Sequence, residues 1–527
     1  MPSCSIRGWD LADRSDSPPS VCGAARESYA RWAGSTEKQG ARVSRTTEEQ
    51  GPVASAPGAP KGFIDRYFEI TARGSNISTE VRGGIVTFVT MAYIVILNPI
   101  ILSGSADVAG DELAFPQVAA VTALTAGVMT ILFGVVARLP FAFAAGLGIN
   151  SFLAVSVVGQ VTWPEAMGLV VINGLIIVLL AVTGLRRMIF TAVPLQLKLA
   201  ITVGIGLFIA FIGFVDAGFV RATGVGSPPV GLGVDGSVAT VPTLIFVFTL
   251  LITGILVARK IKGAILIGLL TGTVVAVIVE AIAGLGSSVD NPGGWGLSVP
   301  ALPTQWVSLP DLSLIGQVSF GSFERIGVLA ALMLVFTLVF TNFFDAMGTM
   351  TGLSKEARLA DAKGDFPRLK SALVVEGVGA VAGGFTSSSS NTVFIESGSG
   401  IGEGARTGLA NVVTGLLFLA AVFFTPLTSI VPTEVAAAAL VIVGALMMAQ
   451  IKDIDFSEFS VLLPVFLTVT VMPLTYSIAN GIGAGFISWV IVRALAGKAR
   501  EISPLLWIVA AGFLVYFARG PVEALLG

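Results

Sequence analysis

Two stretches decide the predicted fold of this chain: LFGVVARLPFAFAAG at residues 132–146 and AGGFTSSSSNTVFIE at residues 382–396. Aligned on Gly134 and Gly384, both contain a helix end, an extended run and a glycine-rich restart at equal offsets, so that Gly146 corresponds to Glu396. The polar groups of the second stretch would be unsatisfied in lipid, so it must line protein or a cavity. We expect two short extended segments that meet at mid-membrane, each followed by a half-helix.

The composition indicates an integral membrane protein. Mean hydropathy is +0.88, and only 12% of the 527 residues are charged, against about 25% in soluble domains. The chain has no histidine, and its two cysteines, Cys4 and Cys22, lie near the N-terminus. A Ser/His/Asp or Cys/His catalytic site is therefore excluded, and we expect no enzyme activity, no metal site and no organic cofactor.

Apolar stretches predict fourteen transmembrane segments, seven on each side of a polar connection at 285–324. The first seven cover about 83–103, 117–138, 147–159, 165–184, 195–215, 240–258 and 263–284. The second seven cover about 327–350, 371–385, 397–404, 407–427, 432–449, 458–475 and 477–495. Seven is an odd number, so the two halves must have opposite orientations in the membrane, which is the inverted repeat typical of secondary transporters.

These segments define the predicted organisation. Residues 1–62 are polar and are interpreted as a disordered tail or a misassigned translation start. The first repeat is 63–284, the connection 285–324 lies outside the cell, and the second repeat is 325–500. A last piece, 501–527, contains an apolar stretch at 503–517 that is short for a span, and the sequence leaves open whether it crosses the membrane or lies in the interface.

Basic residues gather in the loops that this plan places in the cytoplasm, whereas the other loops are nearly bare of them. The basic positions are Arg138, Arg186, Arg187, Arg259, Lys260, Lys262, Lys355, Arg358, Lys363, Arg368, Lys370, Arg406 and Lys452. Arg221 is the main exception. The positive-inside rule then predicts a multi-pass protein of the cytoplasmic membrane with both termini in the cytoplasm.

Asp345 and Glu396 lie in or beside apolar segments. A charge in hydrocarbon costs about 2.5 to 3.5 kcal/mol, so such residues are candidates for function. Without histidine, any proton handled near neutral pH must be carried by a carboxyl group. Asn342 precedes Asp345 by three residues and shares its helix face. Residues 347–349 are expected to end that helix, so Asp345 could instead be a solvated residue near the helix end.

Three further positions have a structural alternative. Glu396 precedes a glycine-rich half-helix and could be an N-cap that satisfies backbone donors. Glu376 follows Lys370 by six residues and could serve function or support near the inner face equally well. Asn150 could bond a ligand, or it could hold two helices together.

Five motifs resemble the nucleobase:cation symporter-2 family, in particular its hypoxanthine–adenine–guanine permease branch. They are FIDRYF at 63–68, TEVRGGIVTFVTMAYI at 79–94, FFDAMGT at 343–349, FIES at 394–397 and GARTG at 404–408. The resemblance implies an all-α membrane protein with a core domain of segments 1–4 and 8–11 and a gate domain of segments 5–7 and 12–14. It also implies proton-coupled uptake of a purine nucleobase, often by a homodimer, and gives no reason to expect a nucleic-acid partner.

The resemblance also implies roles for single residues. The acid of segment 10 falls on Glu396, that of segment 8 on Asp345, the supporting acid of segment 9 on Glu376, and the asparagine of segment 3 on Asn150. One departure is Asn342, where the branch usually has aspartate; its amide both donates and accepts hydrogen bonds, so base preference or proton coupling could differ.

We therefore predict a binding site between the two extended segments, beside Gly146. A planar base stacks near Phe394, while Glu396 and either Asn342 or Asp345 bond its ring nitrogens and exocyclic groups. Two other functions remain open: an anion exchanger of the same architecture, and a membrane sensor that binds a base without transporting it.

Overall fold

The computed structural model describes residues 62–526, apart from 186–191, 225–226, 234–235, 239, 297, 304, 361–365 and the side chains of 519–526. The tail predicted for 1–62 falls outside the described residues, except for Gly62. Arg186, Arg187 and Lys363, three of the predicted inner basic residues, also lie outside them.

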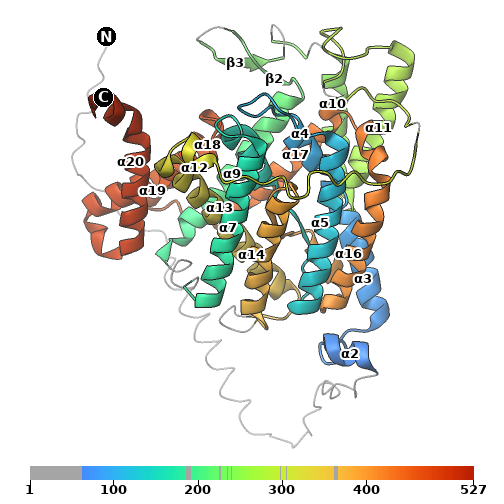
Figure 1. The fold of residues 1–527 in the computed structure, drawn as a ribbon, viewed down its shortest axis with the longest axis horizontal. Coiled ribbons are helices and arrows are strands. Elements are labelled where there is room, and N and C mark those ends of the chain that lie inside the picture. Colours follow the sequence, from blue (N-terminus) through green and yellow to red (C-terminus); the bar gives the residue numbers. More distant parts are fainter. Residues whose placement is uncertain are drawn as a thin grey trace, which may run out of the picture. The chain divides into compact units, whose positions relative to one another are not determined.

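The described chain is almost entirely helical (Figure 1). Its first half contains α2 (Phe63–Phe68), α3 (Ile77–Met91), α4 (Ile94–Ser103), α5 (Phe115–Val136), β1 (Phe143–Ala145), α6 (Leu147–Phe152), the π-helical η1 (Leu153–Val157), α7 (Trp163–Thr183), α9 (Leu195–Asp216), β2 (Val220–Ala222), β3 (Val230–Leu232), α10 (Val241–Ala258) and α11 (Ala264–Ala283).

The second half repeats the pattern of long helices around one short strand. It contains α12 (Ser322–Arg325), α13 (Val328–Glu356), α14 (Leu369–Phe385), β4 (Asn391–Val393), α15 (Ser397–Gly402), α16 (Gly408–Ala421), the 3₁₀ segment η2 (Val422–Ile430), α17 (Thr433–Met448), the 3₁₀ segment η3 (Ala449–Asp453), α18 (Phe459–Leu474), α19 (Ile478–Arg493), the short turns η4 (Ala494–Lys498) and η5 (Ala499–Glu501), and α20 (Pro504–Leu526).

Local sequence signals start several of these helices. Thr162 and Glu165 form a capping box at the start of α7, with a proline in its first turn. The Thr240 side chain accepts a hydrogen bond from the Thr243 backbone at the start of α10. One prediction is wrong here: 347–349 does not end its helix, because α13 continues to Glu356. A lone glycine costs a helix only about 1 kcal/mol and does not stop it.

The long helices form two groups. In what we call the core group, α7 packs on α14, α5 on α16, and α3 on α15 and α16, with β1, β4 and α13 among them. In the gate group, α9 packs on α17 and α18, α10 on α11 and α17, and α18 on α19. The pairs α7–α14, α5–α16 and α9–α17 each join a helix of the first half to one of the second, and Figure 1 shows α7 beside α14 and α5 beside α16.

Glycines allow the paired helices of the core group to approach closely. A Cβ atom on Gly408 would lie 1.9 Å from the Gly134 carbonyl oxygen across the α5–α16 contact. A Cβ atom on Gly377 would lie 2.9 Å from the Gly174 carbonyl oxygen across the α7–α14 contact. Small residues at helix contacts are typical of proteins in lipid, where close backbone packing replaces the hydrophobic effect as the source of helix association.

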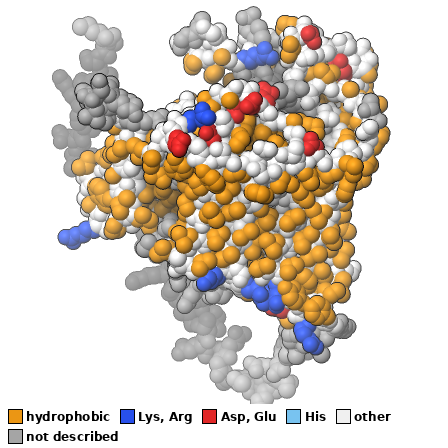
Figure 2. All heavy atoms as spheres, in the orientation of Figure 1, with side chains coloured by type: hydrophobic (Ala, Val, Ile, Leu, Met, Phe, Trp, Pro, Cys, Tyr) orange, Lys and Arg blue, Asp and Glu red, His pale blue; other side chains and the backbone are white. Residues whose placement is uncertain are grey.

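The surface is suited to a membrane. The described part contains 10 helices long and apolar enough to cross one, while α18, α20 and the α6–η1 segment are shorter apolar helices. Figure 2 shows a broad apolar band on one face, with charged side chains gathered at its two ends. The chain is thus a multi-pass membrane protein, whereas the count of fourteen segments and the inverted repeat stay predictions.

Candidate functional site

The two predicted extended segments pair with each other at the centre of the core group. β1 and β4 are antiparallel, with Phe143 opposite Val393 and Ala145 opposite Asn391. The Gly146 backbone N–H donates to the Ser390 carbonyl (2.9 Å), and the Phe394 N–H donates to the Ala142 carbonyl (2.9 Å). The short strands therefore satisfy each other's backbone groups, which polar backbone away from water requires.

Buried side chains fix this strand pair to the helices around it. The Thr130 hydroxyl donates to the Phe143 carbonyl (3.1 Å) and accepts from the Phe143 N–H (2.9 Å). The Asn411 amide donates to the Phe141 carbonyl (2.6 Å), and the Ser397 hydroxyl accepts from the Ala142 N–H (2.9 Å). Because α5, α15 and α16 all supply anchors, the pair is a rigid platform for the residues that follow each strand.

Glu396 lies three residues after the end of β4, at the position before the first residue of α15. Its side chain does not cap that helix. Instead, one carboxylate oxygen accepts a hydrogen bond of 2.6 Å from the hydroxyl of Tyr93, whose side chain is fully buried. Glu396 itself is only partly buried. The structure therefore does not support the N-cap alternative, and it leaves the carboxylate oriented by a group that sequence reasoning did not identify.

Asp345 lies on α13, eleven residues before the last residue of that helix, Glu356. At 1.5 Å per residue it lies about 16 Å from the helix end, so it is not a residue of the helix terminus. Its side chain is partly buried and interacts electrostatically with Glu396. Glu376, which is fully buried on α14, interacts electrostatically with Asp345 and lies against Thr392 and Val393 of β4. The three predicted acids thus form one cluster beside the strand pair.

Asn342 and Gly146 meet at one serine. The Asn342 amide donates to the Ser390 hydroxyl (3.1 Å), and Ser390 also accepts the backbone hydrogen bond of Gly146. The Asn342 amide oxygen is buried and has no hydrogen-bond partner among the described residues. Buried polar atoms are normally paired, so this oxygen is an acceptor available to a ligand or to water.

Asn150 is held by a second asparagine. Its amide donates to the Asn98 side-chain oxygen (2.5 Å), and the Asn98 amide donates to the Thr122 hydroxyl (2.7 Å) and the Ser388 carbonyl (3.1 Å). The helix-linking alternative for Asn150 is therefore part of its role. Its own amide oxygen has no hydrogen-bond partner in the described part of the chain, so one acceptor remains beside α6.

Phe394 and one gate residue complete the surroundings. Phe394 is buried, with 7% of its surface exposed, and its backbone belongs to the strand pairing. From the gate group, the Lys198 ammonium on α9 lies 5.5 Å from the ring centre of Phe344, the neighbour of Asp345 in sequence. A cation within 6 Å of an aromatic ring is in the range of a cation–π contact. The gate group thus places an ammonium group against an aromatic ring of α13.

Sequence reasoning missed Tyr93, Asn98 and Lys198. Asn98 and Lys198 are polar side chains inside otherwise apolar helices, which is the signal that identified Asp345, whereas Tyr93 lies in the turn between α3 and α4. Tyr93 lies within a motif already noted at 79–94, yet only the folded structure shows that its hydroxyl faces Glu396.

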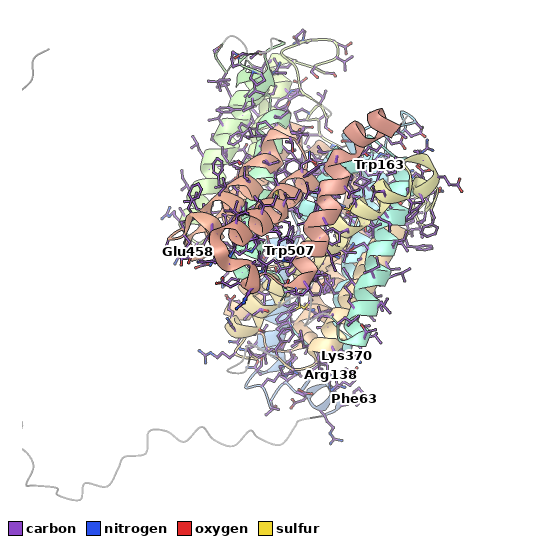
Figure 3. All side chains as sticks on the ribbon, turned by 90° about the vertical axis from the view of Figure 1, so that its left-hand side faces the viewer. Phe63, Arg138, Trp163, Lys370, Glu458 and Trp507 are labelled. Atoms are coloured by element: carbon purple, nitrogen blue, oxygen red, sulfur yellow. The ribbon has the colours of Figure 1, made fainter. Side chains whose placement is uncertain are left out.

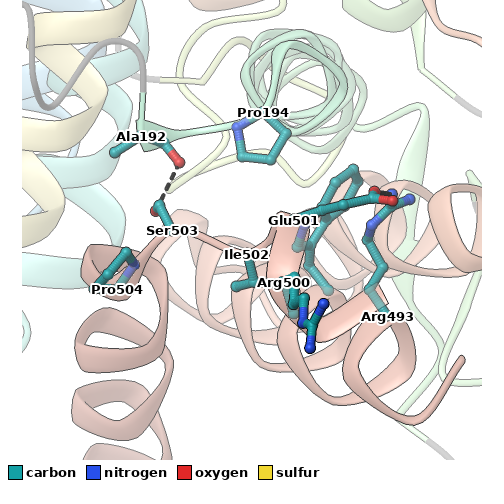
Figure 4. Close-up of a pocket in the computed structure, with 9 residues that line it drawn as sticks. Ala192, Pro194, Arg493, Arg500, Glu501, Ile502, Ser503 and Pro504 are labelled. Atoms are coloured by element: carbon teal, nitrogen blue, oxygen red, sulfur yellow. Dashed lines mark hydrogen bonds and ion pairs between the residues drawn. The ribbon is translucent and has the colours of Figure 1, made fainter. Parts of the chain in front are cut away.

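Cavities also lie elsewhere in the described structure. One of about 440 Å³ lies where α9, α19 and α20 meet and is lined by Arg493, Arg500 and Glu501 (Figure 4). There Arg493 pairs with Glu501 and its guanidinium lies 5.0 Å from the Trp489 ring centre, so this cavity belongs to the gate group. A second, of about 690 Å³, lies between the groups and is lined by Ser151, Asp216 and Tyr476 among others. Ser151 follows Asn150, so this cavity approaches the site.

Comparison with known proteins gives consistent matches. Residues 78–484 match the model of a family described as a permease family. The chain is 38% identical to the guanine/hypoxanthine permease PbuG of Bacillus subtilis, over 86% of this chain and 98% of the relative. It is 35% identical to the adenine permease AdeP of Escherichia coli, over 86% and 96%. Among solved structures, the transmembrane domain of a cyanobacterial bicarbonate transporter, BicA, superposes with a TM-score of 0.54 at 16% identity, covering 79% of this chain and 97% of that one.

Proposed function

Because the chain belongs to this permease family, the nucleobase:cation symporter-2 family, we propose that it takes up purine nucleobases together with protons across the cytoplasmic membrane. It is a membrane permease and not an enzyme. We propose that the end bearing Arg138, Lys355 and Lys370 faces the cytoplasm, as the positive-inside rule predicts. The homodimer implied by the resemblance is part of the proposal.

The observation that carries the proposal is the arrangement of Asp345 and Glu396 beside the β1–β4 pair. A purine presents N–H donors and ring-nitrogen acceptors around a flat edge. An ionised carboxylate only accepts hydrogen bonds, whereas an amide both donates and accepts. In our proposal Glu396 accepts a hydrogen bond from a ring N–H of the purine. The free amide oxygens of Asn342 and Asn150 accept hydrogen bonds from its other N–H groups, and the ring stacks near Phe394.

The same two carboxylates supply a physical basis for proton coupling. Asp345 and Glu396 interact electrostatically, so a proton bound to either one relieves repulsion within the site. Neutralising one intramembrane charge also makes it easier for the core group to move against the gate group. The base carries no charge, so the proton couples uptake to the membrane potential, which contributes about 2.3 kcal/mol per charge per 100 mV.

Uptake of labelled hypoxanthine into proteoliposomes under an imposed proton gradient tests the proposal. We expect accumulation only with the gradient, and its loss in Glu396→Gln. The matched control is Asp311→Asn, because Asp311 lies in the connection before α12, where it bonds Gln117 at the exposed surface. If Glu396→Gln accumulated hypoxanthine like the wild type and kept its proton dependence, the assignment would be wrong.

The same assay separates the alternatives. Competition by adenine, guanine, xanthine and uracil defines the base preference, and competition by sulfate or bicarbonate in place of purines would favour an anion exchanger. The likeness to the bicarbonate transporter shows the fold alone, and two acids at the site disfavour an anion. Measurable hypoxanthine binding without any uptake would favour a sensor.

A further inference from the structure

A cavity at the basic end of the core group is lined by three arginines. It measures about 610 Å³, and Arg73, Arg358 and Arg406 line it together with the backbone around Gly74 and Gly404. The arginines come from three separate places: the α2–α3 connection, the turn after α13, and the turn between α15 and α16. No acidic residue is among the described residues that line it. Figure 3 shows Arg138 and Lys370 at this end and Trp163 at the opposite one.

Two of the arginines are held in place. Arg73 donates to the backbone carbonyls of Arg138 (2.7 Å) and Arg406 (3.2 Å) and pairs with Glu69 (2.8 Å). Arg406 donates to the carbonyls of Ile401 and Ala405, both at 2.7 Å. These bonds fix each guanidinium in the cavity wall, so the positive charge is preorganised and does not have to be ordered when an anion binds.

Positive charge exceeds negative charge around this cavity. Glu69 faces not only Arg73 but also Arg138 at 3.4 Å and Arg368 at 3.6 Å. Although partial burial raises the pKa of the Glu69 carboxyl, the hydrogen bond and charge of Arg73, with the charges of Arg368 and Arg138, bring it below its usual value. One carboxylate thus compensates three guanidinium groups, and Arg358 adds to the excess. Arg406 has acids of its own beside it, since it interacts electrostatically with Glu356 and its backbone N–H donates to Glu80 (2.9 Å).

Arg358 occupies a backbone position that favours glycine. Its φ is 58°, in the left-handed region. The Arg358 N–H bonds the Lys355 carbonyl (3.0 Å) and the Leu359 N–H bonds the Ser354 carbonyl (2.8 Å), which is the Schellman motif that ends α13. Glycine is the usual residue at this position, and any other residue strains the backbone. The Arg358 side chain is exposed and has no hydrogen-bond or ion-pair partner in the described part of the chain. An arginine that occupies a strained backbone position, and whose guanidinium has no partner in the described part of the protein, is a candidate for ligand binding.

We propose that this arginine cavity binds a phosphate-bearing anion. Arginine guanidinium groups recognise phosphate through paired N–H donors. A cavity of about 610 Å³ is larger than a bare phosphate requires and falls in the range of small-ligand sites, so the phosphate would carry an attached group. Such a group could be a soluble phosphomonoester or the headgroup of an anionic lipid, since both share this chemistry.

Binding to the purified full-length protein tests the proposal without any transport measurement. The probes are inorganic phosphate, adenosine monophosphate, and phosphatidylcholine vesicles with or without phosphatidylglycerol, all compared with potassium chloride at matched ionic strength. The readout is the saturable rise in unfolding temperature. We expect Arg358→Gln to weaken binding about tenfold, since a charge-assisted hydrogen bond is worth roughly that factor or more.

Two further variants exclude trivial explanations. Arg358→Gly removes the charge and the backbone strain together, so it should lose affinity while its ligand-free unfolding temperature equals or exceeds that of the wild type. Arg259→Gln removes an exposed charge at the end of α10 in the gate group and should bind like the wild type. If Arg358→Gln weakens the binding of inorganic phosphate and adenosine monophosphate, the ligand is a free phosphomonoester. If it weakens only the binding of vesicles that contain phosphatidylglycerol, the ligand is a lipid headgroup. Stabilisation no greater than with chloride, or equal losses in Arg259→Gln and Arg358→Gln, would overturn the proposal.

Discussion

Replacing Tyr93 by phenylalanine removes one atom from the proposed site. The Tyr93 hydroxyl donates to the Glu396 carboxylate at 2.6 Å, a length typical of a hydrogen bond to a charged acceptor. Such bonds contribute about 1.5 to 3 kcal/mol, which corresponds to a factor of about 12 to 150 in an equilibrium constant. The ring is fully buried, and phenylalanine keeps its volume, so the change should not open a cavity.

We expect Tyr93→Phe to raise the KM for hypoxanthine at least tenfold, because the carboxylate is no longer held in the orientation that accepts from the base. The assay is initial-rate uptake of labelled hypoxanthine at fixed external pH, with transporter amounts matched. Tyr67→Phe is the control, since that hydroxyl donates to a neutral backbone carbonyl, that of Val135 (3.2 Å), near the arginine cavity.

A double-mutant cycle makes the prediction sharper. If Tyr93 acts through Glu396, Tyr93→Phe should change the affinity for hypoxanthine, measured as binding to the purified protein, by less than about threefold in a Glu396→Gln background, because the two residues form one unit. A Tyr93→Phe protein whose KM matched the wild type, while Glu396→Gln was impaired, would refute the reasoning. It would mean that the hydrogen bond seen in the structure does not set the binding geometry.

Three other predictions concern the fold and its orientation. Gly408→Ala places a methyl group 1.9 Å from the Gly134 carbonyl oxygen and should lower stability by about 1 to 3 kcal/mol in thermal unfolding, whereas Gly352→Ala, with nothing within 4 Å, should not. The pKa of Glu69 is lowered in the folded protein, so the Glu69 carboxylate stabilises the fold at pH values above the ordinary pKa of 4.5, and this stabilisation is lost as the pH falls below that value. Glu69→Gln should therefore lose less unfolding temperature on acidification than the wild type. The only cysteines are Cys4 and Cys22, so a membrane-impermeant maleimide should label inside-out vesicles but not intact cells, and the reverse result would place the N-terminus outside.

Much of the architecture could be predicted from the sequence. The apolar stretches identify the long helices because hydrocarbon selects for composition over about twenty consecutive residues. The run 387–391 and the run that begins at Pro140 could not be lipid-facing helices, which indicated extended segments; β4 begins at the end of the first run, and β1 lies within the second. The end of α13 was misplaced, because a glycine at 348 resembles a stop although the capping bonds form only at 358–359.

The candidate site shows more clearly what could not be predicted from the sequence. Asp345, Glu396 and Glu376 stand out in the sequence because a charge in an apolar segment is costly, wherever its partners are. Their partners do not stand out in the same way: Tyr93 is 303 positions from Glu396, and Asn98 is 290 positions from Ser388. Which hydroxyl or carbonyl faces a given side chain depends on how α3, α4 and α13 pack around the strand pair.

The sequence by itself therefore determined that this is a membrane protein, where its long helices lie, and which charged residues in apolar segments are candidates for function. Each of these conclusions depends only on the free energy of moving a single side chain from water into lipid. Only the tertiary structure decided which groups meet. It paired β1 with β4, oriented Glu396 by Tyr93, and gathered Arg73, Arg358 and Arg406 around one cavity. Such contacts depend on distances between segments far apart in the chain, and those distances are fixed only when the helices pack.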